Sequence, residues 1–341
     1  MKLISFCIPT YNRASQCNRL VKEILKSHNE DFEVIVADNC STDDTVALLR
    51  KIQDKRLFIH TSTHNVGSFL NGLNSCSKAT GKYIYYTLDK DMIDSSNIDS
   101  FALFLQHNDL SCGYCEYLPK PGSVNKIYSQ GYDAICSVGY LGRHPSGCIF
   151  NREKLIEIDY LNRFSHEFVG EHCNDYILAE LASKGNAGIF SEQLTIPQIS
   201  SEAAKDKSLT IKGLNSNSYF TPEARLKSTV NQTIHISDLK LSTKDKEKLT
   251  VKIFITGIIN ATFGYRDLLR NIDICTHYHL EPRKMMNSEL ISIGFSFCKK
   301  YLERTKPSRK AANLKVIKLN LYLGRAVLFK MVKMVKRRFH A

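Results

Sequence analysis

The chain has 341 residues, of which 43% are hydrophobic and 24% are charged, as is ordinary for a globular protein. This length suffices for one large domain or a domain with an appendage, and no run reaches the roughly eighteen uninterrupted apolar residues of a membrane-spanning helix. The formal net charge of +13 is uneven: residues 299–341 hold 14 lysines and arginines and one acidic residue, Glu303, whereas the rest balances at 33 basic and 33 acidic residues. A neutral body therefore carries a cationic appendage.

The N-terminal stretch MKLISFCIPTYNR indicates a strand at the start of the chain. Its apolar part is too short for a signal peptide and no small-residue cleavage site follows, so we expect a cytoplasmic protein. Eleven cysteines at irregular spacings fit reduced thiols. One CxxC pair, Cys112 and Cys115, lacks a second pair at zinc-site spacing, which argues against a metal or redox role.

Strand and helix signals alternate along the first ninety residues. Strands are expected at residues 3–9, 32–38, 57–62 and 82–88, and helices at residues 12–27, 45–53 and 69–79. This alternation predicts an α/β fold, in which a mostly parallel sheet is doubly wound by helices. Ser41 and Asp44 have the spacing of a capping box for the second helix.

The stretch TLDKDMID places two carboxylates, Asp89 and Asp91, just beyond the fourth strand. Side chains alternate along a strand, so these two are expected to point the same way. Two like charges held together favour a hard divalent cation, Mg²⁺ or Mn²⁺, which prefers carboxylate oxygens. The alternative is a polar turn at a strand end.

Polar clusters follow each of the four strands: PTYNR, DNCSTDD, HNVG and DKD. In parallel α/β sheets the ligand crevice lies beyond the carboxyl ends of the strands, so the clusters are expected to converge there. Neither a GxGxxG motif nor a P-loop is present, which excludes the usual phosphate loops. A cation on Asp89 and Asp91 would hold a diphosphate instead.

These motifs, in this order over the first ninety-odd residues, resemble glycosyltransferase family 2, which has the GT-A fold. The later segments HPSGCIFNREKL and NDYILAELASKG resemble bacterial members that build capsule, O-antigen or related surface polysaccharides. The resemblance implies an inverting, metal-dependent transfer of a sugar from a UDP-sugar.

The resemblance also assigns roles to single residues. The nucleotide cradle would comprise Pro9, Thr10, Tyr11 and Arg13, where the alternative is a polar turn with Asn12 as a helix cap. Asp38 would accept a hydrogen bond from uracil, and Asn65 and Gly67 would lie beside the diphosphate. Asp91 would bind the metal directly, and Asp89 would contact the ribose or bind the metal through water. Lys90 stands where many relatives have an aspartate, in the segment that contacts the donor, and is expected to point to the opposite side.

A general base is still needed for the acceptor hydroxyl group. Glu167, Glu171 and Asp175 are spaced by four residues and would share one face of a helix. The resemblance favours Asp175 as the base, with Glu171 second, although Asn174 replaces the usual glutamate. The alternative is that Asp175 interacts only with the dipole of its helix. The loop His144–Gly147 is expected near the acceptor or the sugar, or forms a plain turn.

Beyond this region the chain becomes helical. Thr221 and Pro222 form a helix start, and Ser242 and Asp245 have capping-box spacing. We therefore expect a catalytic domain at residues 1–225 and a helical region at residues 226–341. The polar residues 200–218 would suit a lid over the donor.

The basic tail, residues 299–341, ends in an amphipathic segment. Its lysines gather on one side of a helical wheel, opposite a stripe of leucine, isoleucine and valine. This pattern favours a helix on an anionic membrane surface, at the inner face of the cell membrane, and fits a polyprenyl-linked glycan acceptor. The alternatives are packing on the catalytic domain and nucleic-acid binding, and the latter is disfavoured because no nucleic-acid motif is present.

Two other functions compete with the glycosyltransferase interpretation. A nucleotidyltransferase is disfavoured because its Gly-rich, basic phosphate loop is missing. A degenerate domain that binds a nucleotide-sugar without turnover is supported by Asn174. The oligomeric state is left open, a homo-oligomer included.

Overall fold

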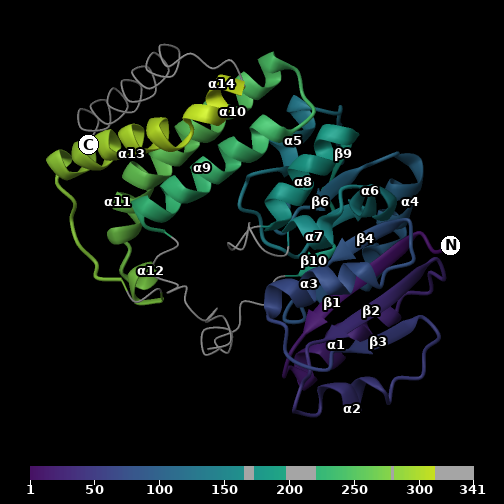
Figure 1. Ribbon diagram of the computed structural model, residues 1–341. Coiled ribbons are helices and arrows are strands. Elements are labelled where there is room, and N and C mark those ends of the chain that lie inside the picture. Colours follow the sequence, from purple (N-terminus) through teal and green to yellow (C-terminus); the bar gives the residue numbers. More distant parts are fainter. Residues whose placement is uncertain (165–172, 197–219, 278–279, 312–341) are drawn as a thin grey trace. The chain divides into compact units, whose positions relative to one another are not determined.

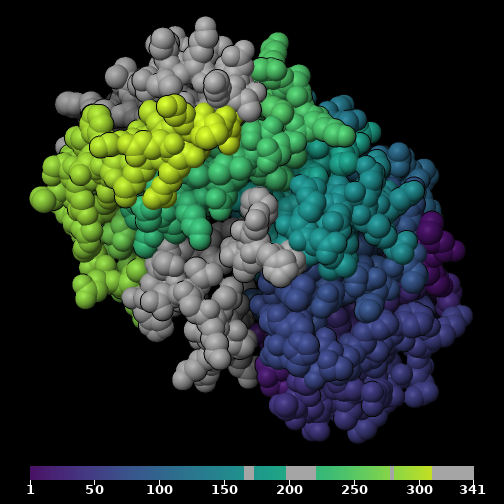
Figure 2. All heavy atoms as spheres, viewed as in Figure 1, coloured from purple at the N-terminus to yellow at the C-terminus, as the bar shows by residue number. Residues whose placement is uncertain are grey.

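The computed structural model describes residues 1–164, 173–196, 220–277 and 280–311 (Figure 1). The chain divides into two compact units, Met1–Ser200 and Ser201–Ala341. In Figure 2 the residues of the first four strands and their helices, coloured purple to blue, form one continuous packed surface.

The first unit is built on a sheet of eight strands in the order β3-β2-β1-β4-β8-β6-β9-β7, with a separate pair formed by β10 and β5. The strands are β1 (Ile4–Thr10), β2 (Phe32–Asp38), β3 (Leu57–Thr61), β4 (Tyr83–Tyr86), β5 (Met92–Ile93), β6 (Cys112–Cys115), β7 (Lys126–Tyr128), β8 (Cys148–Asn151), β9 (Ala187–Phe190) and β10 (Thr195–Ile196).

Strands β1 to β4 pair in parallel, as does β6 with β9. Strand β8 is antiparallel to both of its neighbours, β4 and β6, and the edge strand β7 is antiparallel to β9. The predicted α/β fold with a mostly parallel sheet is therefore confirmed. The four expected strands and their connecting helices are also present.

Helices cover both faces of this sheet (Figure 1). They are α1 (Ala14–Leu25), α2 (Thr45–Leu49), α3 (Ser68–Ser77), α4 (Ile98–His107), α5 (Tyr132–Val138), α6 (Arg152–Glu157), α7 (Tyr160–Phe164) and α8 (Cys173–Lys184), with a 3-10 turn, η1, at Ser95–Asn97. Apolar residues of α1 and α4 pack on one face in a single buried cluster with residues of β1, β2 and β4. On the other face, α3 approaches β4, since Gly72 lies against the Tyr86 ring.

Aromatic rings connect the strands and helices of the core. Phe6 contacts Phe32 and Tyr85, with ring centroids 5.5 and 5.3 Å apart. Phe101 of α4 contacts Tyr85 and Phe190 of β9, at 5.4 and 5.2 Å. All five rings are fully buried, so residues as far apart in the chain as Phe6 and Phe190 stabilise one core.

Strand β4 ends at Tyr86, earlier than expected, so Asp89 and Asp91 lie in a turn rather than in a strand. The Asp91 N–H donates to the Leu88 carbonyl group, which closes this turn. The expectation that strand alternation aligns the two carboxylates is therefore wrong. Tertiary contacts position them instead.

The helices of the second unit are α9 (Pro222–Asp238), α10 (Thr243–Ile259), α11 (Tyr265–Leu269), α12 (Ile272–His277), α13 (Asn287–Arg304) and α14 (Lys306–Ala311), and a π-helical turn, η5 (Asn260–Gly264), joins α10 to α11. Thr221 caps α9 by accepting from the Ala224 N–H, and Ser242 caps α10 by accepting from the Asp245 N–H, so both predicted helix starts are confirmed. Phe254, Phe297 and Tyr301 form the buried centre of this unit.

Across the described residues, the structure contains no helix whose length and hydropathy would allow it to cross a membrane. The amphipathic segment of the basic tail falls almost entirely within residues 312–341, and the expected lid falls within residues 197–219. Both lie outside the described residues.

Candidate active site

The carboxyl ends of the parallel strands meet at one edge of the sheet. The register pairs Thr10 with Asp38 and Asp38 with Thr61. Because β8 runs antiparallel to β4, its beginning reaches the same edge, and the Gly147 N–H donates to the Tyr86 carbonyl group. The expected convergence of polar clusters at this edge is thus present, and the loop before β8 joins it.

Asp89 is buried beside the end of β1. Its two carboxylate oxygens accept hydrogen bonds from the Thr10 hydroxyl group at 2.8 Å and from Arg13 Nη1 at 2.7 Å. The Arg13 pair is an ion pair, with 18% of the Arg13 side chain and 5% of the Asp89 side chain exposed. Asp89 is therefore already neutralised by a basic side chain and holds the β1 loop in place.

Asp91 is only 1% exposed and has different partners. The Tyr117 hydroxyl group donates to Oδ1 at 3.0 Å, and the Ser146 hydroxyl group donates to Oδ2. His144 Nδ1 lies 3.6 Å from Oδ2, and the His144 ring stacks on Tyr117 with centroids 4.2 Å apart. The segment after β6 and the loop before β8 therefore both converge on this carboxylate.

No lysine or arginine forms an ion pair with Asp91 in the part of the chain that the structure describes. Burial lowers the pKa of His144 below its ordinary value, an effect that outweighs the nearby Asp91 carboxylate, while Lys90 lowers it further. The ring is therefore neutral at pH 7. A buried carboxylate with hydroxyl groups and a neutral imidazole around it is a site where an added cation is strongly favoured.

The donor set at Asp91 suits a hard cation, because carboxylate and hydroxyl oxygens are the ligands of Mg²⁺ and Mn²⁺. Within the described residues, no cluster of three or more histidine, cysteine, aspartate or glutamate side chains could hold a metal ion by itself. A cation at Asp91 would therefore need further oxygen ligands from a bound phosphate group and water.

Asp38, at the end of β2, is fully buried and has one unsatisfied oxygen. Oδ2 accepts the Ser41 N–H at 3.1 Å, whereas Oδ1 has no hydrogen-bond partner. An unpaired buried carboxylate oxygen costs free energy unless a ligand or water completes it. A buried carboxylate with one unpaired oxygen is suited to accept a hydrogen bond from an N–H group of a ligand.

The predicted capping box at Ser41 and Asp44 is wrong. Helix α2 begins at Thr45 with Asp44 at its N-cap position, but the Asp44 side chain makes no capping hydrogen bond. The Asp43 carboxylate accepts the Thr45 N–H instead, and Ser41 Oγ accepts the Asn12 N–H of the neighbouring loop. Ser41 is thus used to join two loops at the sheet edge.

Asn12 does not cap α1 either, since Arg13 occupies the N-cap position. Asn12 adopts a left-handed conformation, with φ 50°, and its side-chain oxygen accepts the Thr42 N–H. Pro9 and Tyr11 lie beside it, both half-buried. The loop after β1 is therefore held against the loop after β2 by hydrogen bonds in both directions.

The loop before α3 is organised by Asn65. Its side-chain oxygen accepts hydrogen bonds from Asn39 Nδ2 at 2.8 Å and from the Gly67 N–H at 2.9 Å. Gly67 has φ 89° and ψ 153°, a conformation that only glycine adopts readily. A Cβ atom there would meet no heavy atom within 4 Å, so the backbone conformation, and not space, requires glycine.

Asp175 lies in the first turn of α8 and is 4% exposed. Its Oδ2 accepts the Gly142 N–H at 2.8 Å. Burial raises the pKa of this carboxyl group to about 6, although hydrogen bonds from the Gly142 and Leu141 N–H groups, and the charge and N–H group of Arg143, lower it in part. Asp175 is thus tied to the loop that carries His144 and Ser146. Glu171, the second candidate base, lies outside the described residues.

The sequence does not identify Tyr117 and Ser146 as partners of Asp91; it predicts only that the loop containing Ser146 lies near the acceptor or the sugar, or forms a plain turn. Tyr117 follows the strand CGYC, and the position of a residue just after a strand could have marked it.

Cys112 and Cys115 are buried in that strand with free thiols. Burial raises the pKa of both thiols, which fits the expectation of inert cysteines.

Comparison with known proteins identifies relatives over the first part of the chain. The family model described as "Glycosyl transferase family 2" matches residues 5–156. A GalNAc(5)-diNAcBac-PP-undecaprenol beta-1,3-glucosyltransferase of Campylobacter jejuni is 25% identical over 191 residues, which cover 52% of this chain and 59% of that protein. The abequosyltransferase RfbV of Salmonella typhimurium is 32% identical over 108 residues, 30% of this chain and 32% of that protein.

A third relative is the UDP-Glc:alpha-D-GlcNAc-diphosphoundecaprenol beta-1,3-glucosyltransferase WfaP of Escherichia coli, 27% identical over 38% of this chain and 52% of its own length. The chain thus spans between about a third and three fifths of these relatives.

Solved structures share the fold at low sequence identity. Staphylococcus aureus TarS 1–349 has a TM-score of 0.55 at 14% identity and covers 89% of this chain and 92% of its own. The mannosyltransferase PcManGT from Pyrobaculum calidifontis, solved with GDP-Man and Mn²⁺, has a TM-score of 0.50 at 15% identity, over 95% and 86% of the two chains. Residues 5–156 are thus similar to glycosyltransferases of family 2, and the solved structures share the fold of this chain, with a sheet of the GT-A type.

Proposed function

We propose that this protein is an inverting glycosyltransferase that moves a sugar from a UDP-sugar to a hydroxyl group of a lipid-linked glycan. The observation that carries the proposal is Asp91, a buried carboxylate at the carboxyl ends of the parallel strands whose partners are hydroxyl groups and a neutral imidazole. Such a group is suited to a divalent cation that also binds a diphosphate.

The nucleotide would lie over the loops after β1 and β2. The unpaired Asp38 Oδ1 would accept the N–H of a uracil ring, which supports uridine as the nucleoside. Tyr11 would stack on the base, and Arg13, already paired with Asp89, would face the ribose and phosphates. Asn65 and Gly67 would place backbone close to the diphosphate. The segment of Asp89 and Lys90 would also contact the donor, with the Lys90 side chain directed to the opposite side from the two aspartates.

Asp91, with Asp89 in support, would hold Mn²⁺ or Mg²⁺ together with the donor phosphates. When bound, such an ion offsets the negative charge that develops on the leaving diphosphate. Asp91 itself would orient this end of the donor, because Tyr117 and Ser146 fix both of its oxygens.

Asp175 would take the proton from the acceptor hydroxyl group as that oxygen attacks the sugar carbon and the bond to the diphosphate breaks. Its pKa of about 6 keeps it ionised at pH 7 yet close enough to neutrality for a general base. The base acts on the face opposite the leaving group, so the product is inverted. Glu171 is the second candidate for this role.

The names of the Campylobacter jejuni and Escherichia coli relatives contain undecaprenol-linked glycans, which supports a polyprenyl-linked acceptor for this chain. Such an acceptor requires a place at the inner face of the cell membrane, and the basic tail would bind anionic lipid there. We also propose the division into a catalytic domain, residues 1–225, and a helical region, residues 226–341.

The test is a thermal-shift panel of nucleotide-sugars with and without Mn²⁺, since a bound ligand raises the melting temperature. UDP-sugars are expected to stabilise the protein by about 2.7 kcal/mol at a hundred times their Kd, in the presence of Mn²⁺ only. The variant Asp91→Asn keeps the shape of the side chain and is expected to lose this effect.

The matched control is Asp109→Asn, because Asp109 is exposed and lies outside the candidate site. It is expected to retain the manganese-dependent stabilisation by UDP-sugars. Turnover is measured separately as manganese-dependent hydrolysis of the UDP-sugar, which Asp109→Asn should also retain. A response that does not depend on Mn²⁺, or that survives in Asp91→Asn, would contradict the proposed role of Asp91. Nucleotide binding with no turnover in the native chain would identify a binding protein instead.

A further inference from the structure

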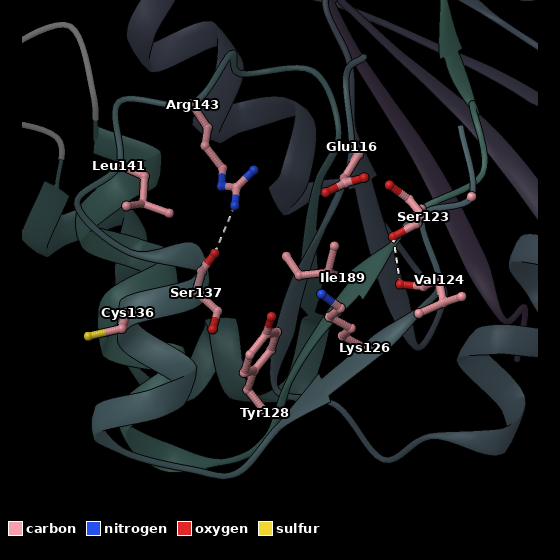
Figure 3. A pocket seen from close by; sticks show the side chains of 12 residues that line it. Glu116, Ser123, Val124, Lys126, Tyr128, Cys136, Ser137, Leu141, Arg143 and Ile189 are labelled. Carbon is pink, nitrogen blue, oxygen red and sulfur yellow. Dashed lines mark hydrogen bonds between the residues drawn. The ribbon is translucent and has the colours of Figure 1, made fainter. Parts of the chain in front are cut away.

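A cavity of about 390 Å³ lies beside the candidate active site in the first unit (Figure 3). It is open to solvent on one side and is lined by the segment after β6, the strands β7 and β9, helix α5 and the loop before β8. Its lining residues are Glu116, Gly122, Ser123, Val124, Lys126, Tyr128, Cys136, Ser137, Leu141, Arg143, Ile189 and Ser191. This volume is within the range of small-molecule pockets. We call it the β7 pocket.

Three charged side chains surround the β7 pocket: Glu116, Lys126 and Arg143 (Figure 3). Within the described part of the chain, the side chains of Glu116 and Lys126 take part in no hydrogen bond or ion pair. The two cations and one carboxylate leave the pocket with one net positive charge. None of the three is proposed to touch the donor, the metal or the reacting atoms, although the charge of Arg143 acts on Asp175.

Arg143 is positioned rather than mobile. Its Nη2 donates to the Ser137 carbonyl group at 2.9 Å, and its guanidinium lies 4.5 Å from the centre of the Tyr114 ring. Its Nε is buried and has no hydrogen-bond partner. Nη1 makes no hydrogen bond within the described residues, so this fixed guanidinium keeps donors for an anionic or hydroxylated ligand at its Nη1 end.

Apolar groups complete the lining. The side chains of Val124, Tyr128 and Ile189 lie around the same space as the charged groups (Figure 3). A sugar ring presents both C–H faces and hydroxyl groups, so it matches a pocket in which apolar side chains alternate with a carboxylate and two cations.

The β7 pocket is joined to the candidate active site by two short segments. Glu116 directly precedes Tyr117, which donates to Asp91. Arg143 directly follows Gly142, whose N–H binds Asp175, and directly precedes His144. A ligand in this pocket would therefore contact residues next to both the proposed metal-binding carboxylate and the proposed base.

We infer that the β7 pocket is a second carbohydrate subsite, which binds a non-reacting sugar residue of the acceptor that carries an acidic group. This inference rests on the proposed function, because only a glycosyltransferase has a glycan acceptor. Lys126 and Arg143 pair with the acidic group, and Glu116 accepts hydrogen bonds from the ring hydroxyl groups. The acidic group is a carboxylate, as in a uronic acid, or a phosphate ester.

The test is a titration of the full chain, methyl-labelled for NMR, with D-glucuronate, D-glucose 6-phosphate or D-glucose. Saturable shifts are expected at the methyl groups of Val124, Leu141 and Ile189 with at least one of the acidic sugars, and weaker binding is expected with glucose. Shifts with glucuronate alone identify a uronic acid, and shifts with the phosphate ester alone identify a phosphorylated sugar. No shift with either acidic sugar, or equal binding of glucose, would overturn the inference.

The variant Lys126→Met removes one cation from an exposed side chain and is expected to weaken binding of the acidic sugar about fivefold. Lys51→Met, at another exposed lysine outside the pocket, is expected to leave that affinity unchanged. Equal affinities in the two variants would contradict the subsite.

Manganese-dependent binding of UDP is measured on the same samples and should be identical in the native chain and both variants. If the proposed function fails, UDP does not bind, yet the methyl groups of the β7 pocket still respond to the acidic sugar. If the subsite fails, UDP binds normally and those methyl groups stay unmoved. The two failures are therefore distinguishable.

Discussion

Asp38 and Asp91 are almost equally buried at the same edge of the sheet, and they differ in their partners. Asp91 has hydroxyl donors on both oxygens, whereas Asp38 has a backbone N–H on one oxygen and nothing on the other. Under the proposed function, the first arrangement would orient a carboxylate toward a cation. The second leaves one oxygen available to a single N–H donor, and under the proposed function Asp38 would determine which base is bound.

Asp38→Asn is expected to weaken binding of UDP about tenfold or more. The Ser41 N–H requires an oxygen, so the amide NH₂ group of the variant would face the position of the uracil N–H, and two donors repel. The corresponding atom of cytosine is an acceptor, so CDP should gain affinity relative to UDP. Calorimetric Kd values for UDP and CDP check this, and an unchanged ratio would contradict the role of Asp38.

Asp175 predicts a pH dependence of catalysis. Its pKa of about 6 means that the ionised base accumulates as the pH rises, so kcat/KM for transfer should increase with pH and reach half of its maximum near pH 6. Asp175→Asn should reduce activity about 10²- to 10⁴-fold and remove this rise. A variant that keeps the rise would exclude Asp175 as the group that titrates.

The burial of Asp175 predicts that stability falls as the pH rises, whereas activity increases. The folded-state pKa lies above the ordinary value of 3.8, so the stabilising contribution of Asp175 is complete below about pH 3.8 and is lost as the pH rises through 6. At pH 8 the ionised group costs at most about 3 kcal/mol, a cost that Asp175→Asn avoids. The variant should therefore melt higher than the native chain at pH 8, and the difference should shrink toward pH 4.

Asp109→Asn is the control for this measurement too, since Asp109 is exposed and its substitution should leave the melting temperature unchanged at every pH. A melting-temperature difference between Asp175→Asn and the native chain that stays constant with pH would show that contacts, rather than charge burial, cause it.

At the scale of single elements, the loop before α3 depends on one glycine. Gly67→Ala should destabilise the first unit by about 1–3 kcal/mol, because an alanine at φ 89° and ψ 153° is strained even though its methyl group meets no neighbour. Ser68→Ala changes the next residue, which is exposed and helical, and should stay within about 0.5 kcal/mol. Urea denaturation followed by circular dichroism compares the two variants.

The elements of the first ninety residues could be predicted because each carries its own signal. Apolar runs of strand length alternate with amphipathic segments. This pattern alone predicts that the residues just after the strands lie at one edge of the sheet, among them Thr10, Arg13, Asp38 and Asp91. The capping box at Ser41 failed because its spacing also suits a loop, and hydrogen bonds to Asn12 and Asp38 decide which forms.

The second half of the sheet could not be predicted in the same way. Strands β6, β7 and β9 have three or four residues each, too few for a clear period, and the reversal of β8 depends on pairing with β4 across more than sixty residues. The contacts of Asp91 with Tyr117 and Ser146 follow from that reversal. Local patterns in the sequence contain no information about the direction of β8.

At the scale of the whole molecule, the charge of the protein is concentrated in its tail. Residues 312–341 contain eight lysines and arginines and no acidic residue. Deletion of these residues should greatly reduce binding to vesicles that contain anionic lipid, since each basic residue near such a surface contributes about 1 kcal/mol. Binding of the full chain should fall as salt rises.

Cosedimentation with anionic and with neutral vesicles, at low and at physiological salt, measures this effect. The truncated chain should keep its manganese-dependent binding of UDP, which separates membrane attachment from donor recognition. Equal cosedimentation of the full and truncated chains would assign membrane binding, if any, to another surface.

Strand β9 occupies the position between β6 and β7, and Phe190 within it completes the ring contacts of Phe101 and Phe104. The recognisable family sequence, however, stops at residue 156. A fragment or chimera cut at that limit would expose the backbone of β6 to other molecules and open a gap among aromatic rings. A fragment that is to fold by itself must therefore extend past Ile196, some forty residues beyond the end of the family match.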